Sequence, residues 1–237
     1  MNSFLGWLAD RVKIQTDVYF AHRYHLSTDW FAPGPIKSLE IGPGGGLFTL
    51  AMLRNGNYCT SVEIADGGAE RILERVKRNK FTQQFNLLRG HVNELHFDSV
   101  YDQVVALEVI EHIVDDETAI ARIASALKPR GRLVLSTPTA SGGYGLFGDY
   151  ISPIEDGGHV RAGYEGPELD KILERHGLIT VKRKYCCYAA NQLLLSVSRF
   201  LPQPFSAGLN LLARPFVPLL DAPVGKPYMQ LTLAIKI

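Results

Sequence analysis

A short glycine-rich segment, residues 42–46, constrains the fold of this chain more than any other feature. It follows an extended run, Ile36 to Ile41, and precedes an apolar segment, Leu47 to Leu53, that is typical of a helix. A strand, a glycine-dense turn and a helix in this order build a nucleotide-type ligand site at the edge of an open α/β sheet. A phosphate site would favour a lysine or bare amides here. The chain instead has the acidic Glu40 just before the turn, which favours a ligand with positive charge and hydroxyl groups.

Strands and helices alternate through most of the chain. Strands are expected at 36–41, 58–64, 85–89, 102–107, 132–137, 178–185 and 228–237, and helices at 47–53, 66–79, 115–128 and from Pro167. Two helical stripes are expected to be buried, namely Ala69, Ile72, Leu73 and Val76, and then Ile120, Ile123, Ala124 and Leu127. The order predicts an α/β fold: a Rossmann-like, seven-stranded, mostly parallel sheet with helices on both faces. An N-terminal helical lid and a helical insert before the last strand complete the expected architecture.

A length of 237 residues suits one domain with additions. We expect an N-terminal helical segment (1–35), a cofactor-binding core (36–185), an apolar helical insert (186–227) and the last strand (228–237). Two segments are expected to act as lids, the aromatic and basic Tyr19 to His25 and the glycine-rich Gly142 to His159.

Composition narrows the class of protein. A net charge of +1 gives no broad basic field, which argues against a nucleic-acid binder. Cys59, Cys186 and Cys187 form neither a disulfide framework nor a zinc-ligand pattern, so reduced thiols in a cytoplasmic protein are expected. The stretch Met1 to Ile14 lacks the features of a signal peptide and is expected to be an amphipathic helix packed on the domain.

Five segments resemble, in order, those of the class I S-adenosylmethionine-dependent methyltransferase family, in the subgroup that acts on small molecules, quinones, lipids and sugars. They are Leu39 to Gly46, Ser61 to Asp66, Leu88 to Phe97, Tyr101 to Ile113 and Leu127 to Pro138. The glycine turn alone would be weak, because dinucleotide-binding folds share it, but the ordered set is far more specific.

The resemblance implies positions for S-adenosylmethionine. Glu40, Gly42 and Gly44 match residues that line the methionine moiety, and Gly46 lets the following helix pack close. Glu63 matches the acid that binds both ribose hydroxyls, which suits a carboxylate because it can accept two hydrogen bonds. The other implied cofactor contacts are Ile64 against the adenine face, His91, Val92 and Leu107.

His91 departs from the family pattern, since relatives usually have an aspartate that accepts a hydrogen bond from the adenine amino group. A neutral histidine can also accept one, but a protonated histidine cannot. Asn93 or a backbone group is the alternative.

A cluster of acids and histidines is the candidate catalytic site. Glu108, Glu111 and His112 have i, i+3 and i+4 spacing and can converge on one side of a helical turn. The pattern is similar to that of small-RNA 2′-O-methyltransferases and some ubiquinone-pathway O-methyltransferases, in which a divalent metal can bind there with a later histidine, here His159. Three interpretations stay open: a metal centre on these four residues, a metal-free site with His112 or His159 as general base and Glu108 orienting the substrate, or a brace of the strand-to-helix turn.

The expected function is O-methylation of a small hydroxylated acceptor, such as a sugar, a quinone precursor or a lipid-linked intermediate. The alternatives are a metal-dependent small-RNA 2′-O-methyltransferase and a non-catalytic, cofactor-binding partner subunit. The apolar insert predicts a lid, a homodimer interface or a patch for a membrane or a lipid-linked acceptor. Arg161, Arg199 and Arg214 are candidates for recognising a phosphate or carboxylate on the acceptor.

Overall fold

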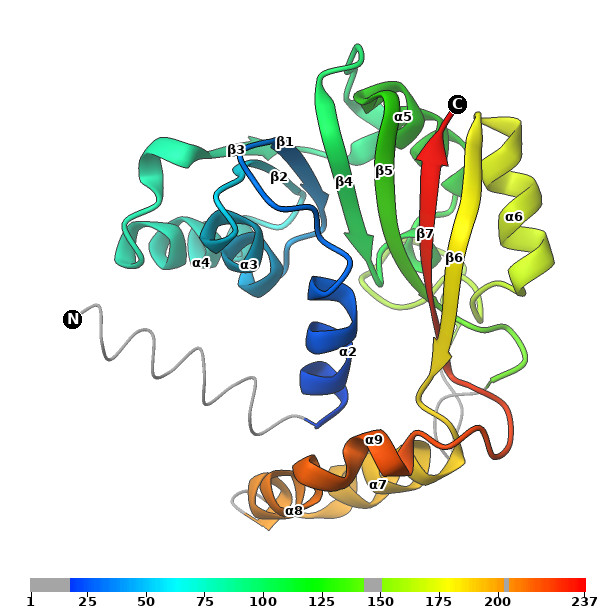
Figure 1. Ribbon diagram of the computed structural model, residues 1–237. Helices are drawn as coiled ribbons and strands as arrows, with labels where there is room; N and C mark the ends of the chain where they lie inside the picture. The colour runs from blue at the N-terminus through cyan, green and yellow to red at the C-terminus, as the bar shows by residue number, and fades with distance from the viewer. Residues whose placement is uncertain (1–17, 143–150, 203–204) are drawn as a thin grey trace.

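A seven-stranded sheet forms the centre of the fold in the computed structural model, which describes residues 18–142, 151–202 and 205–237 (Figure 1). The strand order is β3-β2-β1-β4-β5-β7-β6. Neighbours from β3 to β5 are parallel, and β7 lies antiparallel between β5 and β6. The strands are β1 (Lys37–Ile41), β2 (Tyr58–Glu63), β3 (Phe85–Arg89), β4 (Tyr101–Leu107), β5 (Leu127–Pro138), β6 (Leu178–Cys186) and β7 (Met229–Lys236). This sheet, with the helices around it, confirms the predicted fold class.

Helices pack on both faces of the sheet and beyond the carboxyl ends of its parallel strands. They are α2 (Val18–Thr28), α3 (Leu47–Arg54), α4 (Asp66–Arg78), α5 (Asp116–Ala126), α6 (Gly166–Arg175), α7 (Ala189–Phe200), α8 (Phe205–Ala213) and α9 (Val217–Leu220). Short 3₁₀ turns are η1 (Thr82–Gln84), η2 (Val92–Glu94), η3 (Ile110–His112) and η4 (Arg214–Phe216).

The central strand β4 shows how the core is divided. Alternate side chains of a strand point to opposite faces of the sheet. Val104 and Ala106 therefore pack in the cluster that includes α5 and α6, whereas Val105 and Leu107 pack in the cluster that includes α3 and α4. A strand buried on both faces needs an almost continuous apolar run, which is why its sequence could be recognised.

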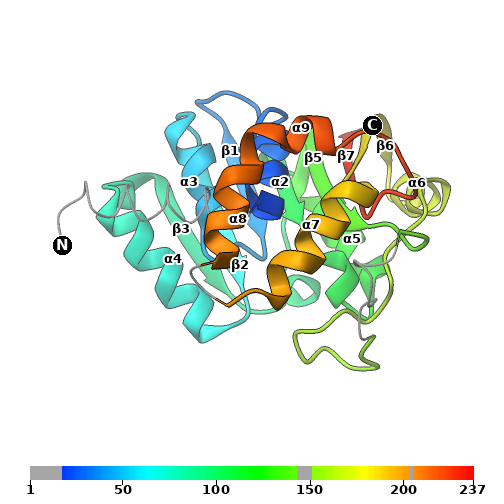
Figure 2. The same cartoon turned by 90° about the horizontal axis from the view of Figure 1, so that it is seen from below.

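The helices α7, α8 and α9 form a cap beyond the carboxyl ends of the parallel strands (Figure 1). Helix α2 lies between the sheet and this cap and packs against α3, α7 and α8. Figure 2 shows the cap from below, with α7, α8 and α9 arranged around α2. Elements from both ends of the chain thus meet at the edge of the sheet where α/β folds bind their ligands.

Two details of the expected helices are wrong. Leu127 was expected on the buried face of a helix, but it starts β5 and pairs with Tyr101. The cause is Pro129, because a proline disfavours helical geometry just before it. Leu73 was expected to be buried but is 44% exposed, since the buried stripe of α4 is narrow and contains only Ala69, Ile72 and Val76 of the expected set.

The expected amphipathic helix at 1–14 lies wholly, and the expected lid segment 142–159 lies partly, in residues that the structure does not describe. Residues 1–17 and 143–150 lie outside the described part of the chain. Among the described helices, none is both long enough and apolar enough to cross a membrane.

Candidate active site

The glycine turn at the end of β1 brings the main chain close to its neighbours. Gly42, Gly44 and Gly46 have φ angles of 64°, 53° and 71°, a region that favours glycine. A Cβ atom on Gly42 would lie 2.8 Å from Val109 Cγ2, and one on Gly46 would lie 2.8 Å from Ile72 Cγ1. The glycines therefore permit both the sharp turn and the close packing of α3 against α4.

A pocket of about 240 Å³ opens beside this turn, at the carboxyl ends of β1, β2 and β4. Five of the expected cofactor residues line it, namely Gly42, Glu63, Ile64, His91 and Val92. Glu108 and His112 line the same pocket, so candidate catalytic groups border the expected cofactor site.

Glu63 is held in place at the start of α4. Its carboxylate accepts a hydrogen bond of 2.9 Å from the backbone N–H of Ala65. A Cβ atom on Gly68 would lie 2.6 Å from the Glu63 carboxyl carbon, so only glycine leaves room for this carboxylate. The placement agrees with a role toward ribose hydroxyls, which stays a prediction.

Glu40 lies beneath the turn and not in the pocket lining. The residue is 3% exposed, and its carboxylate accepts hydrogen bonds from the hydroxyls of Thr49 and Ser61. Burial raises the pKa of Glu40 to about 7, against the opposing effect of those two hydroxyls and with a further rise from the charge of Glu63. The group therefore supports the turn from below, and its contact with the methionine moiety stays a prediction.

His91 uses both ring nitrogens within the protein. The N–H of Asn93 donates to its Nδ1 at 3.2 Å, so the proton of the neutral ring lies on Nε2, which is 3.2 Å from the Glu155 carboxylate. An adenine amino group would have to replace one of these partners. Asn93, the alternative, donates through Nδ2 to the Asp115 carbonyl at 3.0 Å, and its buried Oδ1 has no hydrogen-bond partner among the described residues.

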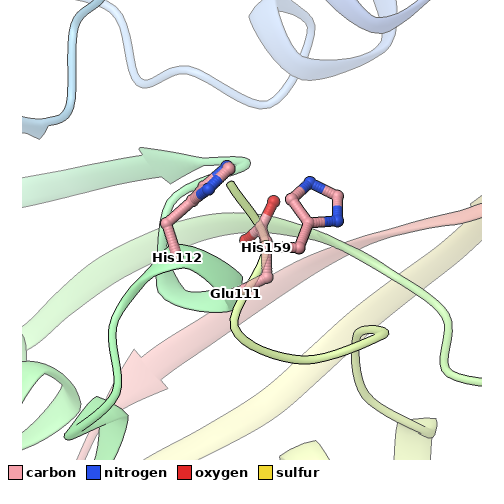
Figure 3. Close-up of side chains that lie close together, drawn as sticks. All are labelled: Glu111, His112 and His159. Carbon is pink, nitrogen blue, oxygen red and sulfur yellow. The ribbon is translucent and has the colours of Figure 1, made fainter. Parts of the chain in front are cut away.

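Three of the four expected metal ligands converge. Ligand atoms of Glu111, His112 and His159 all lie within 4.8 Å of one another. Figure 3 shows the Glu111 carboxylate between the two imidazole rings, whose centroids are 4.7 Å apart. Nδ1 of His112 donates to the Gly158 carbonyl at 2.8 Å, which leaves the lone pair of the neutral ring on Nε2. Such a second hydrogen bond is typical of metal-binding histidines.

The Glu111 carboxylate is the unusual member of this group. The residue is 0% exposed, and neither carboxylate oxygen has a hydrogen-bond partner in the described part of the chain. Burial, and next the charge of Glu108, raise the pKa of Glu111 well above its ordinary value, against the opposing effects of its own backbone N–H and then of the charges of Arg23 and Arg161. A buried carboxylate without a partner is costly, so this group calls for a proton or a cation.

Glu108 points elsewhere. Its backbone has a φ of 56°, and its carboxylate accepts a hydrogen bond of 2.8 Å from Ser136 and lies 3.8 Å from the Arg23 guanidinium. The atoms of Glu108 are not part of the group formed by Glu111, His112 and His159. Glu108 is thus placed between the cofactor pocket and α2.

The comparison with known proteins agrees with this geometry. A family model described as a methyltransferase domain matches residues 16–182. The chain belongs to this methyltransferase family. The match confirms the predicted recognition, and S-adenosylmethionine is the cofactor of the class I enzymes with this fold.

Curated relatives of this methyltransferase include the ubiquinone biosynthesis O-methyltransferases of Rickettsia akari and Rickettsia prowazekii. The first is 29% identical over 102 residues, which are 43% of this chain and 40% of the relative. The second is 29% identical over 117 residues, which are 49% of this chain and 46% of the relative. The match therefore spans less than half the length of these relatives.

Solved structures similar to this methyltransferase include an S-adenosylmethionine-dependent methyltransferase from Mesorhizobium loti. The TM-score is 0.63 and the sequence identity is 16%, and the match covers 94% of this chain and 100% of that one. The geranyl diphosphate C-methyltransferase of Streptomyces coelicolor A3(2) has a TM-score of 0.66 and 15% identity, covering 92% and 77% of the two chains. At these identities the likeness establishes the fold alone.

Glu155, which was not among the expected site residues, lines the same pocket as Glu63 and His91. One Glu155 oxygen accepts a hydrogen bond of 2.6 Å from the backbone N–H of Val114, and the other pairs with His91. The loop around it is also held by Val160, whose N–H donates to the Glu111 carbonyl at 2.9 Å. The glycines nearby marked a functional loop, but nothing in the sequence marked this acid.

A second pocket, of about 560 Å³, lies between α2, the end of β6 and the cap. Its polar lining includes His22 and His25 of α2, Lys184 and Tyr185 of β6, and Asp221 after α9. Asp221 pairs with His22 at 2.8 Å and accepts a hydrogen bond of 2.6 Å from the N–H of Cys187. Burial acts to raise the pKa of Asp221, but the opposing effects of His22, the Tyr188 N–H and the Asn191 side chain outweigh it and leave the pKa below its ordinary value.

Proposed function

We propose that this methyltransferase transfers the methyl group of S-adenosylmethionine to a hydroxyl oxygen of a small acceptor, such as a sugar, a quinone precursor or a lipid-linked intermediate. We further propose that Glu111, His112 and His159 hold a divalent cation beside the acceptor. The observation that carries the proposal is the buried, unpartnered Glu111 carboxylate, which lies with two imidazoles at the edge of the cofactor pocket.

The three residues fit a cation in chemistry as well as in position. A carboxylate and two neutral imidazoles suit Mg, Mn, Fe or Zn without choosing among them. A bound cation would supply the missing partner of Glu111, and it would act as a Lewis acid that lowers the pKa of the accepting hydroxyl. Oxygen as the acceptor atom is further supported by the similar ubiquinone biosynthesis O-methyltransferases.

The chain itself has mainly to align the reactants and exclude water, because the sulfonium group is already activated. The turn at Gly42 and the carboxylate of Glu63 are placed to hold the donor. The loop with Glu155 and Gly157 covers one side of that pocket. Arg23 on α2 keeps the Glu108 carboxylate turned toward the acceptor side of the fold.

We expect the body of the acceptor in the second pocket, between α2 and the cap, and its reacting hydroxyl beside His112 in the first pocket. The second pocket's volume of about 560 Å³ is in the range of small-molecule sites, and its lining combines apolar surface with histidine, lysine and tyrosine side chains. Arg23 belongs to the same helix as His22 and His25 and lies 3.8 Å from Glu108, which lines the cofactor pocket. Acceptor and donor pockets are thus neighbours across this arginine.

The test combines metal content, cofactor binding and turnover. The purified protein is first analysed for bound metal, and S-adenosylmethionine affinity is measured by calorimetry. Methyl transfer is then assayed on catechols, sugars and a short RNA duplex, before and after chelation and with each metal restored. We expect one bound divalent cation per chain, turnover on a hydroxylated small acceptor, and loss of turnover on chelation.

Matched variants separate the roles. Glu111→Gln should lower metal affinity by more than about 100-fold while cofactor affinity stays within a few fold. His96→Gln, at an exposed histidine outside the cluster, should change neither. Full turnover in a metal-free protein would instead leave His112 or His159 as a general base, and turnover on RNA alone would refute the small acceptor.

Cofactor binding without turnover on any acceptor or RNA would refute the enzymatic proposal for this panel and favour a non-catalytic partner subunit.

A further inference from the structure

The cap formed by α7, α8 and α9 has apolar side chains on its outside. Leu193, Phe205, Leu211, Leu212, Phe216 and Leu219 are between 52% and 76% exposed. They come from three consecutive helical elements and η4, which face the viewer together in Figure 2. Single exposed apolar residues are ordinary, but six large ones on consecutive elements of one cap indicate an interaction surface.

The same helices turn polar side chains inward. On α7, Asn191, Ser196 and Ser198 are buried while Leu193 and Val197 are exposed. Ser206 of α8 is likewise buried. The buried hydroxyls of Ser196 and Ser198 donate to carbonyls of their own helix, so their burial costs little. This pattern is the reverse of that of a helix whose outer face meets water.

Charge distinguishes the candidate partners. Residues 189–227 contain three basic residues, Arg199, Arg214 and Lys226, and a single acidic residue, Asp221. The Asp221 side chain is only 8% exposed and is paired with His22, so it offers little charge to a partner. The segment is therefore net basic in sequence, and Lys226 is exposed.

We propose that the outer face of the cap docks on a lipid surface that carries anionic head groups. Apolar side chains enter the boundary between head groups and acyl chains, and the net basic charge of the segment attracts it to the anionic surface, as in interfacial helices. A second copy of the chain is a poorer fit, because a two-fold contact would place each basic segment against its own copy. Docking would bring the second pocket, whose wall includes Val217 and Pro223 of the capping segment, next to the membrane surface.

This inference concerns binding alone and does not depend on the acceptor or the cation proposed above. The experiment mixes the full chain with phosphatidylcholine vesicles, with or without phosphatidylglycerol, and measures the vesicle-bound fraction by flotation. Binding is expected to the vesicles with phosphatidylglycerol and to weaken as salt is added.

Variants then test the face itself. The double variant Leu212→Gln with Leu219→Gln should lower the partition coefficient at least tenfold, without changing the melting temperature or S-adenosylmethionine affinity. Leu73→Gln replaces an equally apolar, 44% exposed leucine on α4, outside the cap, and should leave vesicle binding unchanged.

Three results would overturn the proposal. One is the absence of binding to either kind of vesicle at low salt. Another is a dimer in sedimentation experiments that the double variant abolishes, because a second copy would then cover the face. The third is a fall in melting temperature of the double variant without vesicles, because residues of this chain would then already cover these leucines.

Discussion

Replacing Glu40 by glutamine should stabilise the protein at neutral and alkaline pH. The folded-state pKa of Glu40 is raised from 4.5 to about 7, and burial is the largest cause. A shift of this size corresponds to about 3 kcal/mol, at about 1.4 kcal/mol per pKa unit. Because the pKa is raised on folding, the group's contribution to stability is fully present below pH 4.5 and is lost as the pH rises through about 7. Glutamine fits the same space, cannot ionise, and can still accept hydrogen bonds from the hydroxyls of Thr49 and Ser61.

The measurement is urea unfolding of the wild type and of Glu40→Gln between pH 4.5 and alkaline pH. Other titrating groups are shared, so they cancel in the difference between the two free energies of unfolding. That difference should grow by about 3 kcal/mol in favour of the variant as the pH rises. Glu70→Gln makes the same change at an exposed position of α4 and controls for the substitution itself. A difference that does not vary with pH would refute the reasoning, since Glu40 would then be ionised in the folded protein without cost.

Substitutions at three other buried contacts have the following expected results. Gly68→Ala should weaken S-adenosylmethionine binding roughly 10–100-fold in calorimetry, because the new Cβ displaces the Glu63 carboxylate; unchanged affinity would mean that the ribose lies elsewhere. Tyr164→Phe should lower the free energy of unfolding by about 1–2 kcal/mol, since the buried hydroxyl donates to Asp116 at 2.5 Å; equal stability in urea would contradict this. Asp221→Asn should destabilise the protein by about 1–3 kcal/mol at neutral pH. Because the folded-state pKa of Asp221 is lowered, the stability that its carboxylate contributes is lost as the pH falls, so the penalty should be smaller in acid. A penalty independent of pH would argue against the pairing with His22.

The core of the fold could be predicted because its signals are local. The strand Phe85–Arg89 was placed at its observed bounds, and the helix over 66–79 ends one residue earlier than expected. Periodicity cannot tell which residue at the edge of a stripe is covered, so Leu73 was misjudged. Leu127 was misjudged because the sequence before Pro129 fits the end of a helix and the start of a strand equally well. Only the pairing of Leu127 with Tyr101 in the folded sheet shows that it belongs to the strand.

The acidic and histidine cluster was predicted in part. Glu111 and His112 are adjacent on η3, and the resemblance supplied His159, 47 positions after His112. The spacing of Glu108 assumed a regular helix through Glu108 to His112, but η3 begins at Ile110 and Glu108 has a left-handed φ of 56°. That turn directs the carboxylate to Ser136 and Arg23 instead. A left-handed glutamate has no signature in sequence, because such a conformation is held by its surroundings.

The two pockets differ in predictability for a physical reason. The pocket beside the glycine turn is built from residues next to the ends of consecutive parallel strands, so each part follows a recognisable strand and glycine pattern. The second pocket joins His22, Lys184 and Asp221, which lie on α2, β6 and the segment after α9, far apart in the chain. No spacing rule relates such residues, and each side chain is ordinary on its own. What distinguishes this half of the molecule is visible only after folding, when α7 and α8 bury Asn191 and serine side chains and expose leucine and phenylalanine side chains. If the cap docks on a lipid surface as proposed, that surface would limit which hydroxylated molecules can reach the second pocket.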